Sequence, residues 1–136
     1  MKVIVDTDVW SEAFRQKGEP SVHVRELAAL VEEGRVQLIG PIRQEILCGL
    51  RSSERGAQIC GRLDAFPDRP IDSSIYIMAA QFFNLCRSRG IQGSNTDFLI
   101  CACSVKWRMP ILSKDKDYLG YKELLPIELL TLRRGS

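Results

Sequence analysis

The first ten residues, Met1–Trp10 with the sequence MKVIVDTDVW, decide the fold of this chain. Lys2–Val5 is a short, mostly β-branched run without polar alternation, which is typical of a strand buried on both faces of a parallel sheet. The run ends at Asp6, which puts a carboxylate at the carboxyl end of a central strand, where open α/β sheets bind their ligands. The residues that follow suit the start of a helix over Val9–Phe14. The stretch therefore predicts a strand, an acid and a helix.

Two interpretations of this stretch stay open when it is read alone. Thr7 and Asp8 are good helix caps. In the first interpretation, Asp6 and Asp8 therefore do no more than end the strand and begin the helix. A binding or catalytic site at this position instead requires acids from elsewhere in the chain to reach the same strand ends. The positions of the other carboxylates in the chain therefore distinguish the two interpretations.

The composition is that of one ordinary globular domain over residues 1–136. Of the 136 residues, 45% are hydrophobic and 26% charged, enough for a sizeable core but not for a second domain. The apolar runs are shorter than the roughly 18 residues of a membrane span, and the first strand starts at residue 2, so we expect neither an anchor nor a signal peptide. A net charge of +2 neither demands nor excludes nucleic acid, so any basic surface must be local.

The cysteines and the histidine indicate the compartment and limit the metal chemistry. The cysteines are odd in number and scattered among apolar residues, which predicts buried thiols in a reducing cytoplasm. They are Cys48, Cys60, Cys86, Cys101 and Cys103. Because His23 is the single histidine, zinc sites that need two or three imidazoles are excluded.

Strand and helix signals alternate along the rest of the chain. Helical spacing predicts helices over residues 21–33, from 41 onward, over 54–66 and over 75–89, with a cap at Ser73 or Ser74 for the last of these. Short apolar runs predict strands at residues 35–39, 110–113 and 127–132. Alternating strands and helices favour right-handed crossovers and a parallel sheet, so the predicted class is α/β.

Further acids stand at informative positions. Glu45 lies on the shoulder of the apolar face of the third helix, although most helical glutamates are simply solvated. Asp97 begins a helix that is apolar nearly all round, where an acid can be a simple cap, but a charge at the edge of a buried helix needs a partner. Asp115 and Asp117 follow the strand at 110–113 and repeat the order of strand, acid and helix found at the N-terminus.

Together these motifs resemble those of the PIN-domain family, and the length resembles its VapC-type toxin ribonucleases. The matching segments are Asp6-Thr7 after a hydrophobic strand, Pro41 followed by Glu45, Ile46 and Gly49, Asn95-Thr96-Asp97 before an apolar helix, and Ile111–Tyr118. Each motif alone is weak, but their order and spacing span the whole chain. The resemblance maps Asp6, Glu45, Asp97 and Asp115 onto the four acids of the family. It places Thr7 and Ser113 at hydroxyl positions beside them, with Asp8 and Asp117 as further auxiliary candidates.

This resemblance implies a PIN-like three-layer α/β/α sandwich with a mainly parallel central sheet, and a metal-dependent endoribonuclease that hydrolyses RNA. Carboxylates without imidazole or thiolate suit Mg²⁺ or Mn²⁺, which can activate water and stabilise the charge on a phosphodiester. We expect Asp6 and Asp97 to be the principal metal ligands, with Glu45 and Asp115 as ligands or water-positioning groups.

The resemblance also implies partners. The substrate is expected to be RNA, with tRNA and ribosomal RNA loops as candidates, because looped bases are accessible to reading. A VapB-like antitoxin is expected to cover the acidic cleft, and a homodimer is expected as well. The cations that could bind phosphate lie beside the motif acids or on the helix after Glu45. For the arginines of that helix, a solvent-exposed polar face is the simpler interpretation. They are Arg43, Lys114, Lys116, Arg51, Arg55 and Arg62.

Two other classes of function remain. The N-terminal stretch also resembles the first motif of haloacid-dehalogenase-like phosphatases, with Asp6 as nucleophile and Asp8 as acid/base. That hypothesis gives Glu45 and Asp97 no role. It also needs a Ser/Thr motif, a lysine and an acidic motif that are well separated in the sequence, whereas here these residue types are contiguous at 113–115. A PIN-like domain that only binds RNA or protein is the second, although four retained acids argue against it.

Overall fold

The structure is a computed structural model that describes residues 1–48, 50 and 54–133. Its sheet has three parallel strands, β1 (Val3–Val5), β2 (Val36–Gln37) and β3 (Ile111–Leu112), in the order β2-β1-β3. β1 is therefore the central strand, and its three residues are fully buried. The prediction of a two-face-buried first strand is confirmed.

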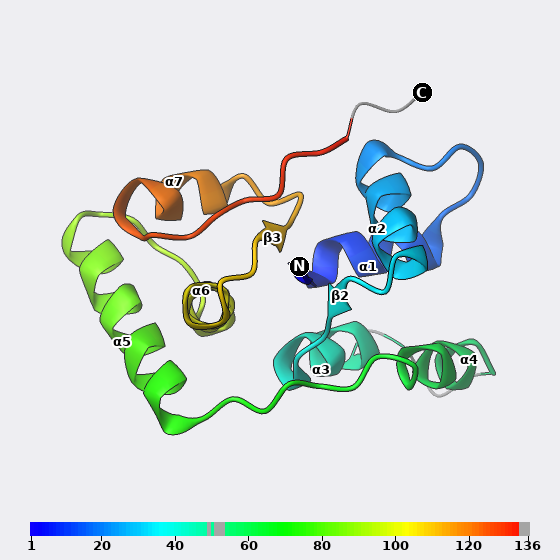
Figure 1. Cartoon of the computed structure of the whole chain (residues 1–136), viewed down its shortest axis with the longest axis horizontal. Helices are drawn as coiled ribbons and strands as arrows, with labels where there is room; N and C mark the ends of the chain where they lie inside the picture. Colours follow the sequence, from blue (N-terminus) through cyan, green and yellow to red (C-terminus); the bar gives the residue numbers. More distant parts are fainter. Residues whose placement is uncertain (49, 51–53, 134–136) are drawn as a thin grey trace.

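Seven helices surround this sheet in the described residues. They are α1 (Thr7–Arg15), α2 (Val22–Glu32), α3 (Gly40–Cys48), α4 (Glu54–Leu63), α5 (Ser73–Ser88), α6 (Asn95–Trp107) and α7 (Asp117–Leu124). Figure 1 shows α1 and α2 on one side of the sheet and α6, backed by α5, on the other. This arrangement is the predicted α/β/α sandwich. None of these helices is long and apolar enough to cross a membrane.

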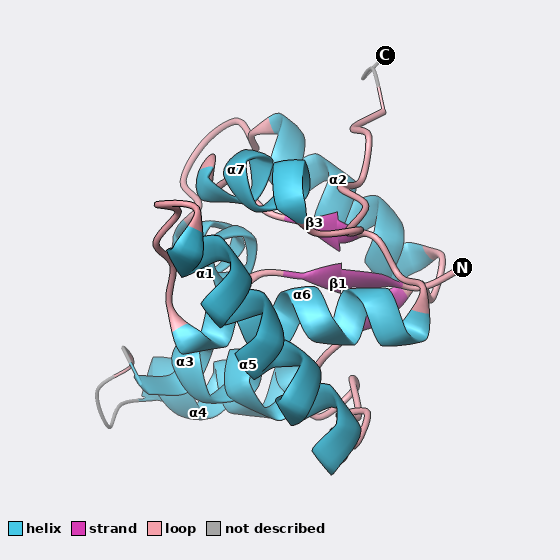
Figure 2. Ribbon diagram, turned by 90° about the vertical axis from the view of Figure 1, so that its left-hand side faces the viewer, coloured by secondary structure: helices cyan, strands magenta, loops and turns pink. Residues whose placement is uncertain are grey.

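The strand direction fixes one end of the molecule as the end that carries polar groups. Ile4 pairs in parallel with both Gln37 and Ile111, so the carboxyl ends of the three strands lie at the same edge. In Figure 2 the arrow of β1 points toward the end of the molecule at which α1 and α3 are labelled. The acid that follows β1 therefore emerges among the starts of these helices.

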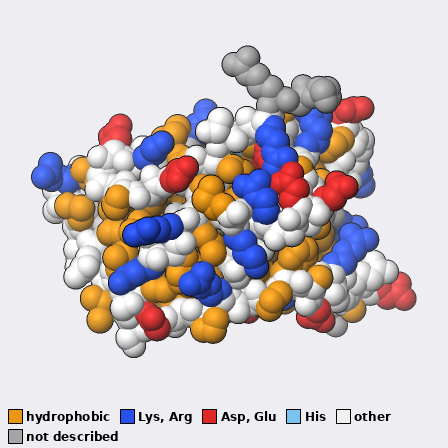
Figure 3. All heavy atoms as spheres, in the orientation of Figure 1, with side chains coloured by type: hydrophobic (Ala, Val, Ile, Leu, Met, Phe, Trp, Pro, Cys, Tyr) orange, Lys and Arg blue, Asp and Glu red, His pale blue; other side chains and the backbone are white. Residues whose placement is uncertain are grey.

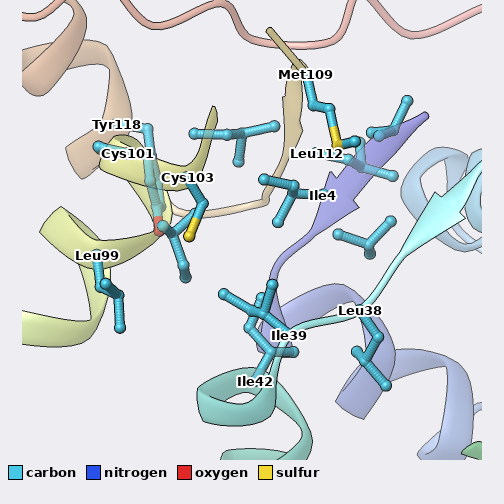
Figure 4. Packing of buried hydrophobic residues seen from close by; sticks show 14 of the residues in the cluster. Ile4, Leu38, Ile39, Ile42, Leu99, Cys101, Cys103, Met109, Leu112 and Tyr118 are labelled. Atoms are coloured by element: carbon cyan, nitrogen blue, oxygen red, sulfur yellow. The ribbon is translucent and has the colours of Figure 1, made fainter. Parts of the chain in front are cut away.

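The interior of the domain is built around β1 and α6. Every residue from Phe98 to Ser104 on α6 is buried, which confirms the prediction of an interior helix. Figure 4 shows Ile4 of β1 among side chains of α3, α6 and β3, including Ile42, Cys103 and Leu112. Burial of this apolar surface stabilises the sheet edge on which the polar residues stand.

Several local predictions were wrong. The segment 127–132 is not a fourth strand, because it pairs only through a bridge at Leu129 beside Ile111, and β3 offers just two residues for pairing. Asp6, not Thr7 or Asp8, caps α1, since its side chain accepts a hydrogen bond from the Thr7 amide. Asp72, not Ser73 or Ser74, caps α5 in the same way.

The cysteines divide into two groups. Cys86, Cys101 and Cys103 are buried as predicted, whereas Cys48 and Cys60 are exposed, which corrects the prediction that all five are buried. The two exposed thiols lie on α3 and α4, the outer helices whose apolar faces are narrow. Gly49 and Arg51, both used in the sequence predictions, lie outside the described residues.

Candidate active site

An open cleft of ≈ 560 Å³ lies where β1 and β3 end. Its lining comes from the segments after both strands, from α3 and from the start of α6. The lining residues are Asp6, Thr7, Asp8, Pro41, Gln44, Glu45, Cys48, Thr96 and Asp115. Four of them are acids, so the fold brings carboxylates from three separate sequence motifs to one cavity.

Asp6 is the buried acid of this cleft. It is 8% exposed, and its carboxylate accepts hydrogen bonds from the Thr7 amide (2.8 Å) and from the Ser113 hydroxyl (2.9 Å). Burial, followed by repulsion from Asp8, raises the pKa of Asp6 to about 6, although the two hydrogen bonds oppose this shift. A cation close to this buried carboxylate would stabilise its ionised form.

Asp8 lies next to Asp6 in the cleft, and only one of its two carboxylate oxygens accepts hydrogen bonds from the described residues. Its Oδ2 accepts a hydrogen bond from the Lys114 amide (3.0 Å) and lies 3.3 Å from the Ser113 hydroxyl. Its Oδ1 is buried and has no hydrogen-bond partner among the described residues. Burial raises the pKa of Asp8, while the hydrogen bonds from Lys114 and Ser113 lower it. The negative charge at this point is therefore only partly compensated by the protein.

Glu45 reaches the cleft from α3. The side chain is exposed, but its Oε1 accepts a 2.6 Å hydrogen bond from the Thr7 hydroxyl. This bond joins residues 38 positions apart and fixes the acid of α3 to the start of α1. Thr7 and Ser113, the two predicted hydroxyl residues, thus each donate to a predicted acid.

Asp97 lies in the first turn of α6, one residue after Thr96, which lines the cleft. It is half-buried, and its Oδ2 accepts a 2.7 Å hydrogen bond from the Tyr121 hydroxyl. The charge of Asp97 itself contributes to the raised pKa of Asp6. Asp97 is therefore within electrostatic reach of Asp6 although it is not one of the lining residues.

The two acids after β3 differ in position. Asp115 is exposed and lines the cleft, and its Oδ1 accepts a hydrogen bond from the Asp117 amide (2.9 Å) at the start of α7. Asp117 is exposed and is not among the residues that line the cleft. Its role is to begin α7, and the structure does not bring its side chain to the acids.

Two of the predicted phosphate-binding cations are engaged elsewhere. Arg43 binds Asp68 (Nε to Oδ1, 3.1 Å) and the Leu63 and Phe66 carbonyls, so it ties α3 to the end of α4. The Lys114 ammonium pairs with Glu12 at 2.6 Å. Figure 3 views the molecule from the opposite side to the cleft, and Lys and Arg side chains gather around the middle of that face.

Some lining residues were not predicted. Cys48 lies three residues after Glu45 and four after Gln44 on α3, so helical spacing would have identified it as a neighbour of both. Tyr121 was missed as well. No sequence signal indicated its contact with Asp97, because that contact depends on how α7 packs against α6.

The donor set fits a hard divalent cation. No three His, Cys, Asp or Glu side chains within residues 1–48, 50 and 54–133 form a ready-made metal cluster. Mg²⁺ usually keeps several waters and binds through only one or two carboxylates, so an open cleft with several carboxylates suits it. The unpaired Asp8 oxygen and the repelled Asp6 carboxylate are the groups that such an ion would compensate.

The fold is the PIN-like α/β sandwich that the sequence predicted, and its cleft has acids at the carboxyl ends of β1 and β3. Two solved structures share this fold over nearly their whole length. One is FitAcB from Neisseria gonorrhoeae, with a TM-score of 0.75 and 19% identity over 95% of this chain and 96% of that one. The other is VapBC2 from Rickettsia felis bound to a DNA fragment from their promoter, with a TM-score of 0.76 and 13% identity over 96% and 98%.

Sequence comparison agrees with the fold. The chain is 29% identical to the ribonuclease VapC11 of Mycobacterium tuberculosis over 119 residues, 85% of this chain and 88% of the relative. A VapC ribonuclease of Mycobacterium bovis matches with the same identity and coverage. The chain matches no protein-family model. The resemblance to VapC-type PIN-domain ribonucleases is confirmed.

Proposed function

We propose that this protein is a metal-dependent endoribonuclease that hydrolyses RNA phosphodiester bonds as the toxin of a toxin–antitoxin pair. The observation that carries the proposal is the convergence of Asp6, Glu45 and Asp115 on one open cleft, with Asp97 close enough to contribute to the raised pKa of Asp6. The likeness to two relatives named VapC ribonucleases supports the same activity. The structures of a VapBC2 assembly and of a toxin-antitoxin complex with the same fold support the toxin role.

The chain's own residues would divide the work as follows. Asp6 and Asp97 would hold a Mg²⁺ or Mn²⁺ ion, with Asp115 and Asp8 beside it. When bound, the ion supplies positive charge for the phosphodiester and acidifies a water. Glu45 is an exposed acid of the cleft, so it is suited to orient that water and accept its proton, and the Thr7 hydroxyl holds the Glu45 side chain in place. No protein nucleophile is needed.

A phosphatase mechanism with Asp6 as nucleophile is less well supported. A nucleophile must reach the phosphorus atom of its substrate, whereas the Asp6 side chain is only 8% exposed. The phosphatase hypothesis also leaves Glu45, which lines the same cleft, without a role.

An antitoxin would have a groove to bind beside this cleft. A second pocket of ≈ 250 Å³ shares Glu45 with the cleft and is lined mainly by α1, α3 and α4, with apolar Phe14, Ile46 and Ile59 next to Arg15 and Arg55. We expect an apolar, partly acidic antitoxin segment in this groove. An antitoxin arginine entering the cleft would bind carboxylates bidentately and exclude the metal ion, so the complex should be inactive. A co-purified partner that leaves the nuclease fully active would contradict this mechanism.

The homodimer is part of the same proposal. Tyr76 and Ile77 on α5 are 53% and 59% exposed, and an apolar pocket of ≈ 520 Å³ lies between α5 and α6. Exposed apolar surface of this kind is typical of a protein interface. Sedimentation equilibrium should show a dimer, and Ile77→Lys should shift it toward monomer. A wild-type monomer at micromolar concentration would contradict the expectation.

The direct test is a cleavage assay on structured RNA. We expect no cleavage in EDTA, and cleavage when Mg²⁺ or Mn²⁺ is restored. Asp97→Asn should abolish it, because the amide keeps the volume but removes the charge. Hydrolysis of small phosphate esters that is lost in Asp6→Asn would favour a phosphatase instead. RNA binding without cleavage under any metal condition would favour a non-catalytic domain.

A further inference from the structure

We infer that Tyr121, seated against Gly93, is a positioning residue that orients the Asp97 carboxylate and thereby sets the cation affinity of the cleft. This inference rests on the proposed function, since it assigns Asp97 a role in holding the ion. It adds a residue of α7 that matched none of the four acidic motifs.

Tyr121 is rigidly held and points its hydroxyl at Asp97. The side chain is fully buried, and its hydroxyl donates a 2.7 Å hydrogen bond to Asp97 Oδ2. Its ring packs against Phe98 at 4.9 Å between centroids and against Tyr118 at 5.3 Å, edge-on. These neighbours hold the ring in place, and with it the position of the hydroxyl oxygen.

Gly93 provides the space for this hydroxyl. A Cβ at Gly93 would overlap the Tyr121 hydroxyl oxygen and lie 2.8 Å from Cζ and 3.0 Å from a ring carbon of Phe98. Any side chain there would therefore displace the tyrosine. Gly93 precedes Ser94, which caps α6 by accepting from the Asp97 amide, so one short segment fixes both the backbone and the side chain of Asp97.

The hydrogen bond is suited to prepare Asp97 for a cation. In this bond the Tyr121 hydroxyl is the donor and the Asp97 carboxylate is the acceptor. With Oδ2 occupied by this donor, the other carboxylate oxygen is left for an ion. Partners that orient a metal-binding carboxylate typically account for roughly 10- to 100-fold in metal affinity or activity.

The neighbouring tyrosine offers a matched control. Tyr118 lies one turn earlier on α7 and is 1% exposed, but its hydroxyl has no hydrogen-bond partner among the described residues. Tyr121→Phe and Tyr118→Phe each remove one buried hydroxyl from the same aromatic cluster. Only the first removes a contact with Asp97.

The experiment is a titration of the full-length protein with Mn²⁺, followed by electron paramagnetic resonance of the free ion without RNA. We expect Tyr121→Phe to weaken Mn²⁺ binding by about 10- to 100-fold. Its RNA cleavage at a fixed, subsaturating Mn²⁺ concentration should lose kcat with little change in KM. Excess Mn²⁺ should restore part of the loss. Gly93→Ala should act in the same direction, and the double variant should be little worse than either one.

Three results would overturn the inference. One is a Tyr121→Phe variant that binds Mn²⁺ as the wild type does while the wild type cleaves RNA, which leaves the proposed function intact. Another is an equal loss in Tyr118→Phe, which would mean general loosening of the aromatic cluster. A wild-type protein that neither binds Mn²⁺ nor cleaves RNA overturns this inference and the proposed function together.

Discussion

Two junctions of strand, acid and helix meet at the cleft, and they differ in burial. After β1, Asp6 follows the strand at once, caps α1 and is 8% exposed. After β3, Ser113 takes the first position and donates its hydroxyl to Asp6, while Asp115 lies two residues further on and is exposed. The sequence repeats the same order of elements, yet only one of the two acids is buried.

The position of each strand in the sheet explains this difference. β1 is central and has neighbours on both sides, so a residue at its end is surrounded by the ends of other elements. β3 lies at the edge of the three-stranded sheet, and its following loop faces solvent. A charge in the first environment is costly without a cation, whereas a charge in the second is solvated. We therefore expect the two acids to contribute differently to stability although both line the same cleft.

Asp6→Asn should give the largest effect. The pKa of Asp6 is raised from 3.8 to about 6, so its ionisation costs the folded state stability as pH rises through this window. A shift of about two pKa units corresponds to about 3 kcal/mol at pH 7. Asparagine caps helices as well as aspartate does. We expect the metal-free variant to be more stable at pH 7 by up to this amount, and RNA cleavage to be lost.

The measurement for Asp6→Asn is urea unfolding of both proteins from pH 3.5 to pH 7. The curves should coincide at the acid end, where the wild-type acid is protonated in both states. They should separate as pH rises. Parallel curves across the whole range would show that the burial of Asp6 does not destabilise the metal-free fold.

Ser113→Ala should have an intermediate effect of the opposite sign. The Ser113 hydroxyl stabilises the ionised form of Asp6, and hydrogen bonds to charged groups contribute about 1.5–3 kcal/mol. The variant should lose stability at pH 7, and its pKa for Asp6 should rise further. Carbon-13 NMR of the Asp6 carboxyl can follow this shift. An unchanged titration would mean that the bond to Asp6 is not formed in solution.

Asp115→Asn should have the smallest effect on stability. The side chain is exposed, and substitutions at such positions usually change the free energy of unfolding by no more than about 0.5 kcal/mol. RNA cleavage should still fall, because Asp115 lines the cleft. A gain in stability as large as that of Asp6→Asn would remove burial as the reason for the difference between the two junctions.

The sequence predicted the strands and acids better than the contacts between helices. Val3–Val5 and Asp6 were predictable because a β-branched run and the acid after it are local features. The Thr7–Glu45 bond and the burial of Asp97 against Tyr121 depend on packing between distant segments, which local patterns do not record. Arg43 illustrates the same limit, since nothing in its neighbourhood indicated that Asp68 would bind it.

The central claim is that Asp6, Glu45, Asp97 and Asp115 form one cation site. Thermal unfolding with and without metal tests this claim most directly. An ion that binds only the folded protein, at about one hundred times its Kd, adds about 2.7 kcal/mol of stability. We predict that millimolar Mg²⁺ or Mn²⁺ raises the unfolding midpoint of the wild type, and that Asp97→Asn loses most of this rise. A wild-type midpoint that neither ion moves would contradict the claim, as would an Asp97→Asn variant that responds to metal as fully as the wild type.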